Sequence, residues 1–260
     1  MLRLRVLTAA VLIAVLVSAL FWLPPAGWWL FSAAVVGVCA WEWGGLVAPA
    51  HRSSYAAALL ALAAGSLWFD AIHPGLSRVW YWGAVCYWVL AAPLWIARPQ
   101  VGAVWTRLLA GVIVLVPAFL AMVELRAWGR GTLLGVLGLV WVSDTAAYVV
   151  GSRFGRHKLA PAISPGKTWE GVVGALLASG VYASAWVASG SALPAPRGAF
   201  VALLLVVTVI GILGDLVESQ LKRVAGVKDS GDLLPGHGGM LDRVDALLAV
   251  LPFAALVFLA

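Results

Sequence analysis

The sequence predicts an all-α, polytopic integral membrane protein in which residues 1–260 form a single transmembrane domain. Hydrophobic residues make up 63% of the 260 residues and charged residues only 11%, whereas a soluble domain usually carries about 25% charged residues. Apolar stretches long enough to cross a hydrocarbon core about 30 Å thick also recur along the whole chain. Together these two observations exclude an ordinary soluble fold.

Nine apolar windows, bounded by glycine, proline or charged residues, are predicted to be membrane-spanning helices. The first follows Arg3 and Arg5 and resembles a signal peptide, but eight more windows follow it, so we interpret it as the first helix. The third window is the shortest. The windows are residues 6–23, 28–47, 55–69, 79–97, 108–124, 133–150, 171–189, 199–218 and 244–260.

The distribution of lysine and arginine predicts the direction of these helices. Of the 17 basic residues, 13 fall on one side of the membrane and four on the other, and the richer side is expected to be cytoplasmic. The amino terminus and the longest loops then lie inside the cell. The 13 are Arg3, Arg5, Arg52, Arg98, Arg107, Arg153, Arg156, Lys158, Lys167, Lys222, Arg223, Lys228 and Arg243, and the four are Arg78, Arg126, Arg130 and Arg197.

The two halves of the chain differ in character. Residues 1–140 are rich in tryptophan, and several indoles fall near predicted span ends, where they are expected to lie at the headgroup level. Residues 141–260 contain two polar segments that are predicted to be cytoplasmic loops. Because helices in lipid need no charged or glycine-rich segment, these loops are the expected site of chemistry.

The first polar loop, residues 151–171, contains Ser-Pro-Gly-Lys-Thr, which invites comparison with a phosphate-binding P-loop. The comparison fails, because Ala162 stands where that motif needs glycine and a membrane helix precedes the segment. A looser phosphate site remains open, since Lys167 supplies a charge and Thr168 a hydroxyl just before a helix start. The basic residues here fit a role as topology determinants equally well.

Acidic residues near the ends of the later spans discriminate better between these interpretations. Asp144 is predicted to lie about seven residues from the end of its helix, on the order of 10 Å deep. Asp215 and Glu218 stand at i and i+3, with Ser219 and Lys222 on the same face if the helix continues. A carboxylate in such a place must pair, take a proton or hold a cation.

Asp242 and Asp245 repeat the i, i+3 spacing at the start of the ninth window, so two acid-bearing helix ends flank one polar loop. Hard oxygen ligands from separate helices, close to cations, suit magnesium that is shared with substrate phosphates. Ion pairing between helices, for example of Asp215 with Lys222, is the structural alternative. Under both interpretations, the acids lie at or next to residues 219–245.

Residues 219–245 hold 8 of the 28 charged residues and a run of glycines. His237 is a single loop histidine, which is more often a hydrogen-bonding partner than a catalyst. Gly238 and Gly239 would let backbone approach a phosphate closely, or would simply form a tight turn. Glu42, by contrast, lies inside the second window, and nothing in the sequence places it near either loop.

The segment that begins at Ser219 resembles the signature of the phosphatidate cytidylyltransferases, also called CDP-diacylglycerol synthases. Residues 143–148 and 163–171 are similar to family segments as well, so the resemblance covers roughly residues 141–245. The residues that match the signature are Ser219, Lys222, Arg223, Lys228, Asp229, Gly231, Pro235, His237, Gly238, Gly239, Asp242, Arg243 and Asp245.

The resemblance implies transfer of a cytidylyl group from CTP to phosphatidate in the bacterial cytoplasmic (inner) membrane, with Mg²⁺ as cofactor and the site facing the cytoplasm. It leaves open a second, monovalent cation and a homodimer. The expected catalytic residues are Asp144, Lys167, Asp215, Lys222, Arg223, Lys228, Asp229, His237, Asp242, Arg243 and Asp245. CTP and phosphate contacts are expected from Ser164, Lys167, Thr168, Ser219, Gly238 and Gly239, and metal ligands from Asp144, Asp215, Glu218, Asp242 and Asp245.

Two other functions fit parts of the pattern. A CTP-dependent lipid kinase would use similar groups but would transfer a phosphate, and an ion-coupled transporter or flippase would also need intramembrane acids. The acids cluster at one predicted membrane face and no symmetry relates the two halves, which disfavours a transporter. The formal charge of +6 is explained by basic residues that determine topology and by attraction to anionic lipid headgroups and nucleotide. No nucleic-acid partner is therefore expected.

Overall fold

The computed structural model describes residues 2–98, 103–191, 193–234, 236 and 238–259. Within these ranges the chain forms ten α-helices and one short β-hairpin. A single 3₁₀ turn precedes α3, and a π-helical turn, Tyr87–Ala91, joins α4 to α5. The elements are α1 (Leu2–Trp22), α2 (Pro25–Val47), α3 (Arg52–Ile72), α4 (Ser77–Cys86), α5 (Ala92–Ala97), α6 (Val104–Trp128), α7 (Arg130–Phe154), β1 (Lys158–Ala160), β2 (Ser164–Thr168), α8 (Trp169–Ala188), α9 (Arg197–Val224) and α10 (Leu241–Phe258).

The all-α membrane class is confirmed, and among the described residues seven helical segments are long and apolar enough to cross a membrane. Helices also cover the first and last predicted windows, but they do not meet the same standard. The apolar part of α1 is the shorter Thr8–Trp22, and α10 carries three charged residues in its first turns, at 242, 243 and 245. The count of nine spans therefore stays a prediction.

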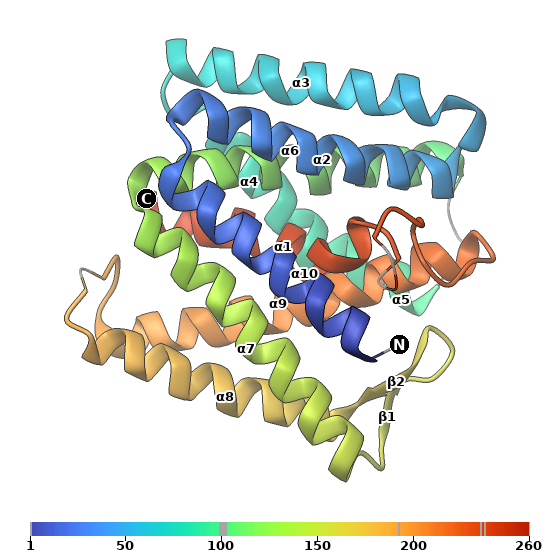
Figure 1. Cartoon of the computed structure of the whole chain (residues 1–260), viewed down its shortest axis with the longest axis vertical. Coiled ribbons are helices and arrows are strands. Elements are labelled where there is room, and N and C mark those ends of the chain that lie inside the picture. Colours follow the sequence, from blue (N-terminus) through green and yellow to red (C-terminus); the bar gives the residue numbers. More distant parts are fainter. Residues whose placement is uncertain (1, 99–102, 192, 235, 237, 260) are drawn as a thin grey trace.

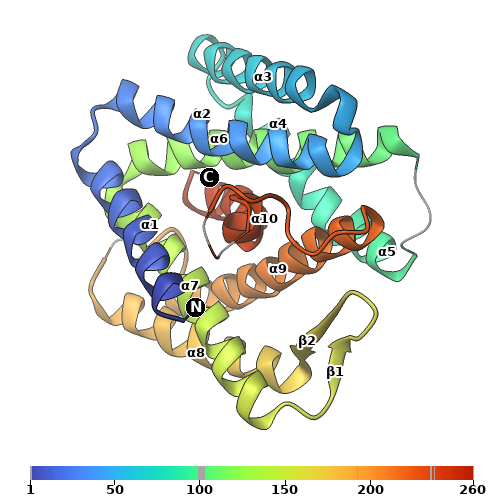
Figure 2. The same cartoon turned by 45° about the vertical axis from the view of Figure 1, so that its right-hand side comes forward.

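Helix α10 lies at the centre of the molecule, and the other helices surround it (Figure 2). It packs against α2, α4, α6, α7 and α9. Its residues from Ala246 to Pro252 are all buried, which an apolar sequence on every face of the helix explains. The buried part of α10 directly after Asp242 and Asp245 is thus held by several helices at once.

The helices run back and forth between two ends of the bundle (Figure 1). At one end, on the right in Figure 1, lie the start of α1, the α2–α3 connection, the facing ends of α5 and α6, the hairpin between α7 and α8, and the segment between α9 and α10. These are the segments to which the sequence assigns the 13 basic residues. Both polar segments therefore open to the same end of the molecule.

Close contact between α7 and α8 places the hairpin beside the site. A Cβ atom on Gly171 would lie 2.8 Å from the carbonyl oxygen of Ala147, and one on Gly174 would lie 2.6 Å from the side chain of Val150. Only glycine allows the two helices to approach so closely. The prediction of a loop over residues 151–171 was wrong in detail, because α7 continues to Phe154 and the antiparallel strands β1 and β2 follow it.

Candidate active site

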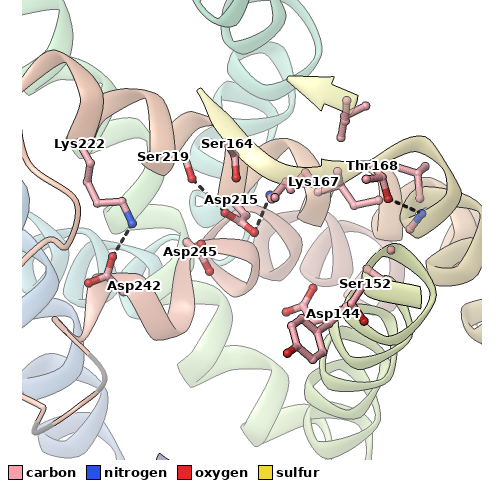
Figure 3. Close-up of a pocket in the computed structure, with 18 of the residues that line it drawn as sticks. Asp144, Ser152, Ser164, Lys167, Thr168, Asp215, Ser219, Lys222, Asp242 and Asp245 are labelled. Atoms are coloured by element: carbon pink, nitrogen blue, oxygen red, sulfur yellow. Dashed lines mark hydrogen bonds and ion pairs between the residues drawn. The ribbon is translucent and has the colours of Figure 1, made fainter. Parts of the chain in front are cut away.

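The β-hairpin delivers Lys167 to the face of α9. Lys158 of β1 pairs with Thr168 of β2, and Thr168 then caps α8, because its hydroxyl accepts the N–H of Gly171 at 3.2 Å. Lys167 is the preceding residue, and its Nζ lies 2.5 Å from Oδ2 of Asp215 (Figure 3). The cation and hydroxyl predicted before a helix start are therefore both present, with the hydroxyl serving as the cap.

Helix α9 continues beyond the predicted window to Val224, so Ser219, Lys222 and Arg223 belong to the helix. The expected shared face is present. The hydroxyl of Ser219 donates to Asp215 at 3.3 Å, and Nζ of Lys222 lies 2.6 Å from Oε2 of Glu218. Ion pairing, the structural alternative considered above, is present between Lys167 and Asp215 and between Lys222 and Asp242. The pair of Lys222 with Asp215 that served as its example is not among the contacts of the described residues.

Asp242 is engaged by the protein on both carboxylate oxygens. Oδ1 accepts Nζ of Lys222 at 2.5 Å, and Oδ2 accepts the backbone N–H groups of Ser230 at 2.9 Å and Gly239 at 2.8 Å. Burial alone would raise the pKa of Asp242, but the ammonium group and the two N–H donors outweigh burial and lower this pKa to about 2. Asp242 is therefore ionised, and it links α9, the loop and the start of α10.

Three carboxylates form the most compact acidic group of the described chain. Oxygen atoms of Asp215, Glu218 and Asp245 lie within 4.8 Å of one another. Glu218 is buried, and its Oε1 has no hydrogen-bond partner. A buried carboxylate oxygen without a donor, next to two further carboxylates, fits a hard divalent cation. Asp144 and Asp242, also expected as metal ligands, lie outside this group.

A cavity of about 810 Å³ joins the hairpin, α7, α9 and α10. Its size falls in the range of pockets that take small-molecule ligands. Figure 3 shows side chains from all of these elements around it, with Asp144 and Ser152 contributed by α7. The predicted site residues that line the cavity are Asp144, Ser164, Lys167, Thr168, Asp215, Ser219, Lys222, Arg223, Lys228, Asp229, Asp242, Arg243 and Asp245.

Two of the predicted residues also shape the site. Arg223 donates from Nε to the carbonyl of Ile163 at 3.1 Å and thereby ties α9 to the hairpin turn. Gly238 has a φ of +80°, and a Cβ there would lie 2.6 Å from Asp242, so this glycine permits the turn around that carboxylate. His237 lies outside the described residues.

Asp144 lies deeper along its helix than the sequence suggests. Because α7 ends at Phe154, Asp144 is ten residues from the helix end instead of seven, or roughly 15 Å at the usual rise. It nevertheless lines the cavity together with Ala147, Tyr148 and Gly151 of the same helix. The lining of the cavity therefore follows α7 from Ser152 to Asp144.

Sequence reasoning missed Glu42, which lies in contact with the segment between α9 and α10. Its carboxylate accepts the backbone N–H groups of Met240 at 2.9 Å and Leu241 at 2.8 Å. Nothing in the sequence places this acid near either polar segment, and the fold brings it there. The one available signal was its position, an unpaired carboxylate inside an apolar window, which membrane helices seldom carry without a function.

Comparison with known proteins assigns the chain to a family. The model of the family described as "Cytidylyltransferase family" matches residues 3–260. The chain belongs to this family. It is similar to the phosphatidate cytidylyltransferase of Pseudomonas aeruginosa, with 41% identity over 274 residues that cover 100% of this chain and 98% of the relative.

Two further relatives of the same name support this family assignment. The phosphatidate cytidylyltransferase of Haemophilus influenzae is 37% identical over 279 residues, which cover 97% of each protein. That of Staphylococcus saprophyticus is 45% identical over 144 residues, 52% of this chain and 51% of the relative. The suspected resemblance, drawn from residues 141–245, is confirmed, and it extends to the amino-terminal half in which no family feature had been recognised.

Proposed function

We propose that this protein transfers a cytidylyl group from CTP to phosphatidate and so makes CDP-diacylglycerol and pyrophosphate for phospholipid biosynthesis. The observation that carries the proposal is a cavity in which Asp215 and Asp245, two of the three clustered carboxylates, lie with lysine and arginine side chains of two separate segments. Full-length similarity to enzymes named phosphatidate cytidylyltransferase supports it.

The reaction needs charge neutralisation and alignment more than acid–base catalysis. A phosphate oxygen of phosphatidate would form a bond to the α-phosphorus of CTP, while the bond from that phosphorus to the bridging oxygen of the β-phosphate breaks. Pyrophosphate leaves with the electron pair. Because the attacking oxygen is already ionised near neutral pH, no covalent enzyme intermediate and no strong general base are required.

The carboxylates Asp215, Glu218 and Asp245 would hold Mg²⁺. Asp144, which lines the cavity together with Asp215 and Asp245, is a further candidate ligand. When bound, the ion would supply positive charge between the phosphates of the two substrates and the leaving pyrophosphate. A monovalent second cation stays a prediction, as does a homodimer.

The basic side chains would hold phosphate oxygens. Lys167 contacts Asp215 and needs only a rotation of its flexible side chain to meet a phosphate in the cavity instead. Lys228 and Arg243 line the same cavity. Lys222 lies between Glu218 and Asp242, where it would offset negative charge beside the metal. Asp242, with both oxygens engaged, would orient Lys222 and the loop.

The position of the cavity suits one water-soluble and one lipid substrate. Its lining combines these charged groups with Ala147, Tyr148, Val172 and Ile212 of helices α7, α8 and α9. The glycerol backbone and acyl chains of phosphatidate would lie toward these apolar residues and the surrounding lipid. CTP would enter from the end of the bundle that holds most of the basic residues, which the charge bias makes cytoplasmic.

A product assay with two radioactive labels tests the proposal against a lipid kinase. Purified protein is given Mg²⁺ with CTP labelled at either the α- or the γ-phosphate, and with either phosphatidate or diacylglycerol. We expect α-label in the lipid and γ-label in pyrophosphate, with phosphatidate as acceptor. Transfer of γ-label to diacylglycerol would indicate a kinase, and no transfer to either lipid would contradict both enzymes and leave a transporter. Asp215→Asn protein is the matched control.

A further inference from the structure

Glu42 is a buried acid in a helix that contributes no residue to the lining of the cavity. It lies on α2 and is 2% exposed. The neighbouring Trp43 fixes this part of α2, because its indole N–H donates to the carbonyl of Arg107 on α6 at 3.0 Å. Gly111 of α6 packs directly beneath that indole. Glu42 therefore projects from a helix that is anchored on α6 and also packs against α10.

The carboxylate of Glu42 holds both ends of the segment between Ser230 and Leu241. Oε1 accepts the N–H of Met240 at 2.9 Å, while Oε2 accepts the N–H of Leu241 at 2.8 Å and the hydroxyl of Ser230 at 2.9 Å. N–H groups at a helix start have no partner within the helix and favour a negative charge. Glu42 thus caps α10 from another helix.

Two glycines of the segment pack directly on this carboxylate. A Cβ atom on Gly231 would lie 2.9 Å from Oε1 of Glu42, and one on Gly239 would lie 2.5 Å from Oε2. Any larger residue would push the backbone off the acid. The glycines are therefore explained by the fit of the segment around Glu42 as much as by the turns that it makes.

A chain of contacts runs from Glu42 to the carboxylate group. The hydroxyl of Ser230 lies 2.9 Å from Glu42 and 3.0 Å from Oδ2 of Asp242. The other oxygen of Asp242 contacts Lys222, whose ammonium group also lies 2.6 Å from Glu218. Displacing the segment from Glu42 would thus change how Asp242 and Lys222 are held beside Glu218.

From these contacts we infer that Glu42 is a positioning residue for the reaction, which closes the Ser230–Leu241 segment and fixes Asp242 and Lys222 next to the metal-binding acids. This inference rests on the proposed function for its kinetic consequence, but the closure itself is a property of the protein without substrate. Glu42 itself touches neither the cavity nor a reacting atom.

Glu42→Gln tests the inference, because it keeps the shape and replaces one accepting oxygen with an NH₂ group that must face N–H donors. We expect turnover to fall about 10- to 100-fold, as loss of a supporting group at a metal site does, with a higher Mg²⁺ concentration at half-maximal rate. Ser230→Ala should change both quantities in the same direction by less, and the double variant should be no worse than Glu42→Gln alone.

Limited trypsin digestion supplies a readout that needs no activity. Lys228 is exposed beside the segment, so loosening the segment should speed cleavage between Lys228 and Asp229 several-fold in Glu42→Gln protein. Glu124→Gln is the matched control, because Glu124 is a partly buried acid of α6 that contacts Ser77 away from the cavity. It should leave turnover, the Mg²⁺ response and cleavage unchanged.

The outcomes separate the inference from the proposed function. If the unaltered protein makes no CDP-lipid, the proposed function fails, while the trypsin result still decides whether Glu42 closes the segment. Unchanged cleavage in Glu42→Gln protein would overturn the closure. Faster cleavage with an unaltered turnover number and unaltered Mg²⁺ response in active protein would leave closure without a role in the reaction and would overturn the positioning role.

Discussion

Asp215, Glu218 and Asp245 bring three carboxylates of two helices within 4.8 Å of one another. Like charges at this separation repel strongly in a partly buried setting, so the group is stable only if protons, lysines or a metal ion offset the charge. Lys167 contacts the first acid and Lys222 the second, which leaves Asp245 without a lysine contact in the described chain. Asp245 is therefore the acid that has most to gain from a metal.

Replacing Asp245 should accordingly be as damaging as replacing Asp215. Asp245→Asn and Asp215→Asn are each expected to lower turnover by more than the ~100-fold that loss of a supporting group costs, because a ligand itself is lost. The measurement is pyrophosphate release over a range of Mg²⁺ concentrations. Asp232→Asn, at an exposed acid of the same segment outside the cavity lining, is the control and should behave as the unaltered protein does.

Single residues could be placed from the sequence only where local spacing constrains them. Asp215 and Glu218 share a helix face because they are one turn apart, and the helical pattern showed this. Glu42 could not be connected to its partners, since 188 to 199 residues separate it from Ser230 and Leu241. Contacts of that range depend on how the helices pack, which spacing does not encode.

At the scale of elements, the α7–α8 pair and its hairpin determine where Lys167 lies. The apolar windows predicted both helices, but they did not predict the strands. Lys-Leu-Ala and Ser-Pro-Gly-Lys-Thr are short and lack the alternation of apolar and polar residues that marks a strand. The hairpin forms instead because the glycine contacts between α7 and α8 hold its two ends together.

Substitution of a contact glycine should therefore destabilise this pair. Gly171→Ala would place a methyl group 2.8 Å from a backbone oxygen of α7 that cannot move aside, and we expect a loss of about 1–3 kcal/mol. Gly180→Ala is a matched control in the same helix, since its Cβ would meet nothing closer than 3.9 Å, and alanine should be neutral or slightly stabilising there. Thermal unfolding in detergent measures both; equal midpoints would contradict the packing account.

At the scale of the whole molecule, the bundle has one basic end and one with few cations. Three of the four arginines assigned to the second end have local partners at helix ends. Arg126 and Arg130 donate to carbonyl oxygens of Leu20 and Phe21 at the end of α1, and Arg78 donates to that of Leu259 after α10. Cations stabilise the carboxyl-terminal ends of helices, which carry a partial negative charge. These three arginines therefore have a structural reason to lie at the end that the charge bias assigns to the outside.

The charge bias predicts that both polar segments face the cytoplasm. Cysteine at Ser152 or Val227, with Cys39 and Cys86 replaced, should react with an impermeant thiol reagent only after the inner membrane is opened. Cysteine at Ser191, in the connection between α8 and α9, should react in cells whose outer envelope alone is permeable. All three positions lie on the surface or at the cavity. Labelling of Ser152 and Val227 variants from opposite sides would rule out one shared site, because a core about 30 Å thick would separate them.

The central place of α10 also has a consequence for how the protein is made. Every helix that surrounds it is synthesised before it, and Glu42 precedes its partner Leu241 by 199 residues. At a synthesis rate of about 5–20 residues per second, roughly 10–40 s pass between the synthesis of Glu42 and that of Leu241, so α2 is made well before its central partner. The space between the earlier helices must be filled by lipid, water or another protein until α10 arrives. We expect the arrival of α10 both to complete the core and to bring the start of α10 onto Glu42.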